Sequence, residues 1–388
     1  MGPRGVHVPV TRISSAAQSG FRPARYGGRV FTPSGSPGQS STDTLSERSR
    51  TTHRLPERPL IFAHRGSSEA FSELTRAAYV QALLDGADGV ECDVQLTRDG
   101  HLVLHHDAQL GRTSNGNGPV SQHTLAQLRA LDFTSWKGVP IPSSHGSADE
   151  QLLTLDELLD LLEAAGRSIG LAVETKHPSP FGHGLEEAVL VLLMRRGWDP
   201  ETGWLGNIKV SIMSFHPDGV RYLLQSVSPR HVCQLVADTT VSTVRHSMRV
   251  GPAAAMVYRA GMRLVVPPAV PIIAHGEVEL AGPGIQFVRD HLHEVINWRA
   301  NGSVLRVWTV DSFVDTHLCL AIGVQQITTN VPADVLRWVG EATDGTATTE
   351  SGAALCHPAM KPTAASGRHA PVRAKSRGPR VAGNPLYA

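Results

Sequence analysis

The stretch from residue 60 to residue 107 constrains the fold most, because polar residues repeatedly end its apolar runs. Its short apolar runs read as β-strands, and they are Leu60–Ala63, Val90–Val94 and Leu102–His105. The first run is followed by His64 and Arg65, and the third is followed by His106. Strands that present titratable groups at their C-terminal ends predict a functional site at one edge of a sheet.

A helix is predicted between the first two runs, over Ser72–Leu84. The apolar residues that follow the i, i+3, i+4, i+7 pattern are Val80, Leu83, Leu84 and Ala87. Ser72 is expected to cap the N-terminus of this helix, and Gly86 its C-terminus. The order strand, helix, strand is typical of a parallel α/β fold.

Two carboxylates, Glu91 and Asp93, lie two residues apart in the second run. Side chains with this spacing leave the same face of a strand, so the two charges repel each other and lose hydration. A cation between them would offset that cost, and oxygen ligands without a thiolate suit Mg²⁺ or Ca²⁺. The alternative is that one carboxylate faces solvent at a sheet edge.

A similar pair, Glu174 and Lys176, follows the apolar run Ser168–Val173. Its spacing again places both side chains on one face. The pair forms either part of a site or an internal ion pair, and both interpretations place it at the end of a strand.

Histidines and an arginine accompany the first carboxylates. His64 and His106 can accept or donate a proton near neutral pH, and Arg65 is suited to holding a phosphate or a carboxylate. Together with a cation they would form a site for cleaving a phosphate ester. A structural role remains the alternative for each imidazole.

The motifs of this stretch resemble the glycerophosphodiester phosphodiesterase family, which shares its barrel with phosphatidylinositol-phospholipase-C-like phosphodiesterases. The family signature is HRG, P-E-N-T, E-x-D, D-G and H-D, in that order. The corresponding segments here are His64-Arg65-Gly66, Ser72-Glu73-Leu74-Thr75, Glu91-Cys92-Asp93, Asp99-Gly100 and His106-Asp107. Ser72 and Leu74 stand where the family commonly has Pro and Asn.

The resemblance implies a set of site residues. One divalent cation, Ca²⁺ or Mg²⁺, would be held by Glu91, Asp93 and Glu174. The catalytic pair would be His64 as the base and His106 as the acid.

Substrate contacts are also implied by the resemblance. Arg65 and Lys176 would bind the phosphate, and Trp308 would wall the glycerol site, although Trp308 is equally compatible with a core position.

The resemblance further implies a hydrolase of lipid and glycerol metabolism that converts glycerophosphodiesters into sn-glycerol 3-phosphate and an alcohol. Two alternatives remain, a phospholipase D-like phosphodiesterase or lyase that acts on intact phospholipids, and a non-catalytic binding barrel. The first would be favoured by an apolar loop at the rim, but residues 108–168 are polar. The second would be expected to lack one of the histidines or carboxylates.

The alternation of elements predicts a TIM-type (β/α)₈ barrel with a small insertion, residues 108–168, after the third strand. Later strands are expected at Ser168–Val173, Lys209–Ser214, His231–Val236, Met262–Pro267, Leu305–Val310 and Gln325–Thr328. Later helices are expected at Thr124–Leu131, Thr154–Ala165, Leu185–Arg196, Val288–Ala300 and Val314–Ile322.

The connection into the third strand is the least regular part of this scheme. Asp99-Gly100 resembles a hairpin turn, but His106 has to share a rim with Glu91. We therefore expect Gln95–Gly100 to cross back as an extended connection that spans roughly 20 Å.

The chain has 388 residues, enough for one barrel, assigned to residues 57–342, and two tails. The tails, residues 1–56 and 343–388, are polar and basic and are expected to be disordered. At most they would make weak peripheral membrane contact. The net charge of +1 gives no indication of nucleic-acid binding. No secretory signal is evident, so a cytoplasmic location is expected, while the oligomeric state is open.

Overall fold

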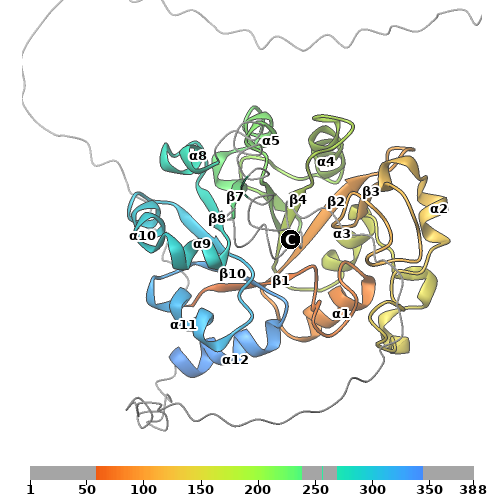
Figure 1. Cartoon of the computed structure of the whole chain (residues 1–388), viewed down its shortest axis with the longest axis horizontal. Coiled ribbons are helices and arrows are strands. Elements are labelled where there is room, and N and C mark those ends of the chain that lie inside the picture. The colour runs from red at the N-terminus through yellow and green to blue at the C-terminus, as the bar shows by residue number, and fades with distance from the viewer. Residues whose placement is uncertain (1–57, 238–255, 257–268, 344–388) are drawn as a thin grey trace, which may run out of the picture. The chain divides into compact units, whose positions relative to one another are not determined.

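The computed structural model describes residues 58–237, 256 and 269–343. Within them, parallel strands form a closed barrel with helices around it (Figure 1). In order around the barrel the strands are β1 (Leu60–His64), β10 (Gln326–Thr329), β9 (Val304–Val307), β8 (Leu280–Pro283), β7 (Val232–Val236), β6 (Ile208–Ser214), β4 (Ile169–Thr175) and β2 (Gly89–Leu96). Pairing of β2 with β1 closes the ring, so the predicted (β/α)₈ barrel is confirmed.

A hairpin extends β2 beyond the barrel. Strand β3 (Leu102–Leu104) runs antiparallel to the end of β2, with Leu104 opposite Val94, and Gly100 turns the chain at φ +82°. The expected extended crossing of Gln95–Gly100 is therefore wrong, and the hairpin signal of Asp99-Gly100 was correct. Because β2 passes the rim before the chain turns, the return strand comes back to the level of Asp93.

The helices between successive strands cover the outside of the barrel. They are α1 (Arg76–Leu84), α4 (Gly184–Arg195), α5 (Pro217–Leu223), α8 (Val270–Ala274), α9 (Ile285–Asp290), α10 (Leu292–Ala300), α11 (Phe313–Ala321) and α12 (Pro332–Thr343). The insertion after β3 contains α2 (Leu125–Arg129), α3 (Leu155–Glu163) and the short 3₁₀ turns Val120–Gln122, Ser143–His145 and Ala148–Glu150. A further 3₁₀ turn covers Pro229–His231, and β5 (Trp204–Leu205) pairs antiparallel with β6. None of the helices in the described part is long and apolar enough to span a membrane.

The first helix begins later than expected. Thr75, not Ser72, is its N-cap, and the Thr75 hydroxyl accepts a hydrogen bond from the Ala78 N–H at 3.3 Å. Leu74 has φ +61°, so the helix cannot extend back through it, and the Ser72 hydroxyl instead donates to the Thr134 carbonyl. Gly86 follows the C-cap with φ +82°, in agreement with its predicted role.

Other differences concern the second half of the barrel. The helix expected over Val288–Ala300 is two helices, α9 and α10, separated at His291, whose backbone is not helical. Strand β8 was not predicted, because its sequence Leu-Ala-Gly-Pro is short and carries turn-forming residues. The strand expected over Met262–Pro267 lies outside the described residues, as do both tails apart from Thr343, which ends α12.

The barrel has a core inside the strands and another between the strands and the helices. The inner core consists of Phe62, Ala172, Met213, Cys233, Leu235 and Leu280. The Phe62 ring lies across Gly89 and Gly170, which are paired in β2 and β4. A Cβ atom at either glycine would lie within 2.6 Å of that ring, so these positions accommodate only glycine without a shift of Phe62.

Replacing Gly170 by Ala should therefore destabilise the protein by about 1–3 kcal/mol, the usual cost of overpacking a core. Gly340 in α12 is the matched control, since a Cβ there meets nothing within 4 Å. Ala at 340 should stabilise by up to ~1 kcal/mol, because alanine favours a helix. Urea unfolding of the two variants measures the difference, and equal midpoints would contradict the placement of the Phe62 ring.

Candidate active site

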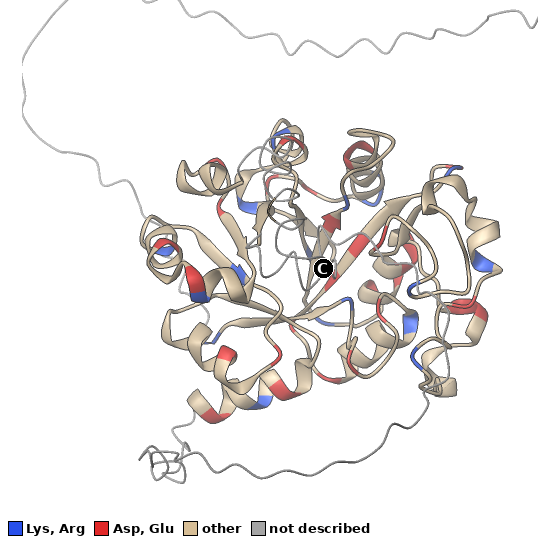
Figure 2. Ribbon diagram, in the orientation of Figure 1, with Lys and Arg blue, Asp and Glu red and all other residues tan. Residues whose placement is uncertain are grey.

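Three buried carboxylates lie together at the mouth of the barrel. Glu91 and Asp93 come from β2, and Glu174 comes from β4, where it is paired with Asp93. Ligand oxygens of all three lie within 4.8 Å of one another. The prediction that Glu91 and Asp93 share a face is confirmed, and the solvent-facing alternative is wrong, since both are about 1% exposed or less. Acidic positions on the central strands are visible in Figure 2.

The protein itself does not neutralise all the negative charge of these carboxylates. Within the described residues, Glu91 Oε1 and both Asp93 oxygens are buried without a hydrogen-bond partner. Burial and the charges of Asp93 and Glu174 raise the pKa of Glu91 well above its ordinary value. Burial likewise raises the pKa of Glu174 to about 7, although Lys176 opposes the shift. A hard divalent cation fits this set of oxygen donors.

Two cations border the triad. Lys176 Nζ lies 3.0 Å from Asp93 Oδ1 and 2.5 Å from Glu174 Oε1, so the Glu174–Lys176 ion pair, one of the two alternatives for this pair, is present. Arg65 Nε lies 3.0 Å from Asp93 Oδ2, and the backbone N–H of Arg65 donates to Glu91 Oε2. The contacts to Asp93 are ion pairs without hydrogen-bond geometry, which is why its oxygens stay unsatisfied. Both side chains are placed to contact an anion that approaches the carboxylates.

His64 lies at the end of β1, with Nε2 3.9 Å from Glu91 Oε2. Its Nδ1 donates to the Asn330 side-chain oxygen at 2.8 Å. Asp311 accepts from the Asn330 side-chain nitrogen at 2.6 Å, which fixes the orientation of the amide. The lone pair of His64 is therefore on Nε2, toward the triad. Burial and the charge of Arg65 lower the pKa of His64 to about 3.

His106 lies beyond β3 on the return of the hairpin. Its Nδ1 donates to Asp107 at 2.6 Å, and Arg112 Nε donates to the other Asp107 oxygen at 2.6 Å. Burial and the charges of Lys176 and Arg65 lower the pKa of His106 to about 4. The hairpin thus brings the second predicted imidazole to the rim that carries Asp93.

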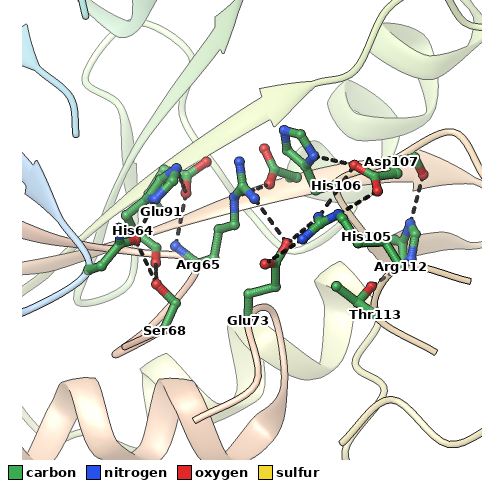
Figure 3. A network of polar contacts seen from close by, with 12 residues as sticks. His64, Arg65, Ser68, Glu73, Glu91, His105, His106, Asp107, Arg112 and Thr113 are labelled. Atoms are coloured by element: carbon green, nitrogen blue, oxygen red, sulfur yellow. Dashed lines mark hydrogen bonds and ion pairs between the residues drawn. The ribbon is translucent and has the colours of Figure 1, made fainter. Parts of the chain in front are cut away.

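An ion-pair network connects this histidine to the triad (Figure 3). Arg112 also donates to both oxygens of Glu73, and Glu73 accepts from Arg65 at 2.9 Å. Burial would raise the pKa of Glu73, but Arg112 and Arg65 lower it to about 2, so it stays ionised. The network therefore alternates negative and positive charge from Asp107 to Asp93.

Four residues of this site had no role predicted from the sequence, and they are Glu73, Asp107, Arg112 and Asn330. Glu73 and Asp107 belong to the signature motifs, so their position was a usable signal. Asn330 is 266 residues from its partner His64, and no spacing along the chain indicates that contact.

Trp308 lies just after β9 and lines a small pocket beside the carboxylate triad. The other lining residues are His64, Arg65, Glu91, Glu174, Lys176, Met213, Phe215, Leu235, Arg306 and Thr328. Trp308 Nε1 donates to the Gly282 carbonyl, and its ring meets Phe215 edge to face at 5.3 Å. The side chain is thus anchored in the barrel and also walls the pocket beside the triad.

Solved structures share this fold. A phosphodiesterase of Oleispira antarctica, in complex with the product sn-glycerol-3-phosphate, matches with a TM-score of 0.55 and 20% identity, covering 73% of this chain and 97% of that chain. A putative glycerophosphoryl diester phosphodiesterase of Agrobacterium tumefaciens also matches with a TM-score of 0.55 and 20% identity, covering 74% and 98%. At this identity the likeness shows the fold.

Sequence relatives are closer. The chain is 36% identical over 286 residues to a probable glycerophosphodiester phosphodiesterase 1 of Mycobacterium tuberculosis, covering 74% of this chain and 94% of the relative. It is 29% identical over 280 residues to a glycerophosphodiester phosphodiesterase of Bacillus subtilis, covering 71% and 85%. Residues 64–334, well over half of the chain, match the glycerophosphoryl diester phosphodiesterase family. The chain therefore belongs to the glycerophosphoryl diester phosphodiesterase family.

Proposed function

We propose that this protein hydrolyses glycerophosphodiesters to sn-glycerol 3-phosphate and an alcohol, with a divalent cation, in the breakdown of glycerophospholipids. The observation that carries the proposal is the buried triad Glu91, Asp93 and Glu174. Two of its members, Glu91 and Glu174, line a pocket together with His64, Arg65 and Lys176. The names of the sequence relatives support the same substrate class.

The triad would hold the cation, either Ca²⁺ or Mg²⁺. When bound, such an ion polarises a phosphoryl oxygen and lowers the pKa of a coordinated hydroxyl. Arg65 and Lys176 hold the remaining charge of the phosphodiester, and their buried position strengthens the attraction.

The partners of the two histidines support different roles. His64 donates from Nδ1 to a neutral amide, which leaves Nε2 ready to accept a proton from the attacking hydroxyl. His106 donates from Nδ1 to the Asp107 carboxylate, a contact that favours the protonated ring and opposes the lowering of its pKa by burial, Lys176 and Arg65. His64 is therefore the base in this proposal, and His106 the acid that protonates the leaving alcohol.

The insertion favours a small substrate over a lipid surface. Between residues 108 and 168, the large apolar side chains that are exposed are Trp136 and Val139. A membrane-binding rim would need a larger apolar patch. Release of glycerol 3-phosphate from glycerophosphocholine, with EDTA-treated protein and each ion added back, tests the proposal, and no release with any ion would contradict it.

Replacing Glu91 by Gln should separate metal binding from folding. The folded-state pKa of Glu91 is raised, so its stabilising contribution exists at low pH and is lost as the pH rises. At pH 7 the metal-free variant should therefore melt at or above the wild-type temperature. Added Ca²⁺ or Mg²⁺ should raise the melting temperature of the wild type much more than that of the variant.

The matched control is the exposed Glu187 on α4, whose replacement by Gln should leave the effect of metal intact. Activity of the Glu91 variant should fall by roughly 10²-fold or more, because the cation stabilises the transition state. Full metal-dependent activity in that variant would rule out the assigned ligand set.

The histidine roles can be separated through the leaving group. His64→Ala and His106→Ala should each lose roughly 10²–10⁴-fold on glycerophosphocholine, the usual share of general acid–base catalysis. A glycerol nitrophenyl phosphodiester releases a good leaving group that needs little protonation. On it, His106→Ala should recover and His64→Ala should not.

The exposed His275 provides the control, and its replacement by Ala should change neither rate. Recovery of His64→Ala instead would reverse the two roles. Recovery of neither variant, with metal still bound, would show that the histidines only position the phosphate.

A further inference from the structure

Arg306 is a buried cation inside the barrel, and in the described part of the chain no carboxylate lies within ion-pair distance of it. Its Nε donates to Gln326 at 2.7 Å, and one terminal nitrogen donates to the Ser211 hydroxyl at 3.0 Å. Among the described residues, the other terminal nitrogen has the Met213 sulfur as its hydrogen-bond acceptor, at 3.8 Å, and sulfur is a weak acceptor. Burial of a charge with so few partners lowers the stability of the fold by several kcal/mol. We therefore expect Arg306 to have a function that offsets this cost.

The guanidinium lies at the floor of the pocket beside the carboxylate triad. Arg306 and Trp308 are two residues apart, and both line that pocket. Two residues advance a strand by about 6.6 Å, so the Arg306 backbone lies nearer the floor of the barrel than the Trp308 backbone. The guanidinium stacks on the Phe62 ring at 4.6 Å, and Phe62 does not line the pocket. The group is therefore on the pocket side of the ring.

A second polar group of the same pocket is Thr328 of β10, which is 2% exposed. In the described part of the chain its hydroxyl oxygen makes no hydrogen bond. A buried hydroxyl without a partner costs about 1–3 kcal/mol. Two incompletely bonded groups at one pocket, from the neighbouring strands β9 and β10, are the expected signature of a binding site for a polar group.

The chemistry of the pocket selects the group that would bind. An oxygen there can accept from Arg306 and exchange a hydrogen bond with Thr328. Because the carboxylates of Glu91 and Glu174 line the same pocket, a negatively charged group next to Arg306 would be repelled. The rings of Trp308 and Phe215 would contact the carbon atoms next to the oxygen. A neutral hydroxyl on a short carbon chain satisfies all three conditions.

We propose that Arg306 and Thr328 form a subsite that binds the terminal hydroxyl of the glycerol unit. This inference rests on the proposed hydrolysis of glycerophosphodiesters and identifies the residues that would select the glycerol. It predicts that the protein discriminates against a substrate that differs only by lacking this hydroxyl.

The test compares glycerophosphocholine with 2-hydroxypropyl phosphocholine, which keeps the middle hydroxyl and replaces the terminal one by hydrogen. The wild type should prefer glycerophosphocholine by about 100-fold or more in kcat/KM, because loss of the hydroxyl leaves buried polar groups unpaired. Arg306→Met should lose roughly 10–100-fold on glycerophosphocholine and less than about 3-fold on the analogue. Thr328→Val should show the same pattern with a loss of about 5–20-fold.

The control is Arg196→Met. Arg196 pairs with Asp156 and Asp160 on the outer helices, so its replacement should change kcat/KM on neither substrate. Arg306→Met should melt at or above the wild-type temperature, because methionine removes a poorly paired buried charge. If it does not fold, Arg306 is structural and the Thr328→Val result decides the role of the hydroxyl subsite.

Two outcomes would contradict the proposed hydroxyl subsite, and a third would contradict the proposed hydrolysis on which it rests. Equal losses on both substrates would show that Arg306 and Thr328 act on the carboxylates or on the fold. Equal kcat/KM of the wild type on both substrates would show that the hydroxyl is not bound. Absence of wild-type activity on both, with metal present, would instead refute the proposed hydrolysis itself.

Discussion

The mutual repulsion of Glu91, Asp93 and Glu174 is the constraint around which this molecule is arranged. The three carboxylates are buried on the paired strands β2 and β4, where water does not screen them. Arg65 and Lys176 offset part of the charge, yet three carboxylate oxygens keep no hydrogen bond. The remaining negative charge is what a divalent cation would neutralise. The parallel barrel makes this possible, since the carboxyl ends of all its strands meet at one rim.

The ion-pair network around His106 shows how three separate segments hold the side chains at that rim in place. The β2–β3 hairpin carries Asp107, the insertion supplies Arg112, and the loop before α1 supplies Glu73. Each of these side chains is held by an opposite charge, so the position of one depends on the others. The insertion therefore contributes directly to the order of the site.

The strands with the strongest apolar runs could be predicted from the sequence, because side chains two residues apart share a face of a strand. The site residues at their ends could also be predicted, because they directly follow the C-terminal end of each run. The path between β2 and β3 could not be predicted. Whether the chain forms a hairpin or crosses back depends on how far β2 extends beyond the rim of the barrel. Thr75 replaces Ser72 as the helix cap because of the backbone angle of Leu74, which composition does not reveal. Asn330 reaches His64 only because β10 and β1 are neighbours in the closed barrel.

The floor of the barrel combines packing with an incompletely paired charge. Glycines at 89 and 170 leave room for the Phe62 ring, and the face of that ring carries the Arg306 guanidinium. Such a cation–π contact contributes about 0.5–2 kcal/mol, which offsets only part of the cost of burying the charge. An acid beside Arg306 would stabilise the fold further, but it would also occupy the N–H groups that face the pocket. Neutral partners such as Gln326 and Ser211 hold the side chain in place and leave donors for a bound hydroxyl.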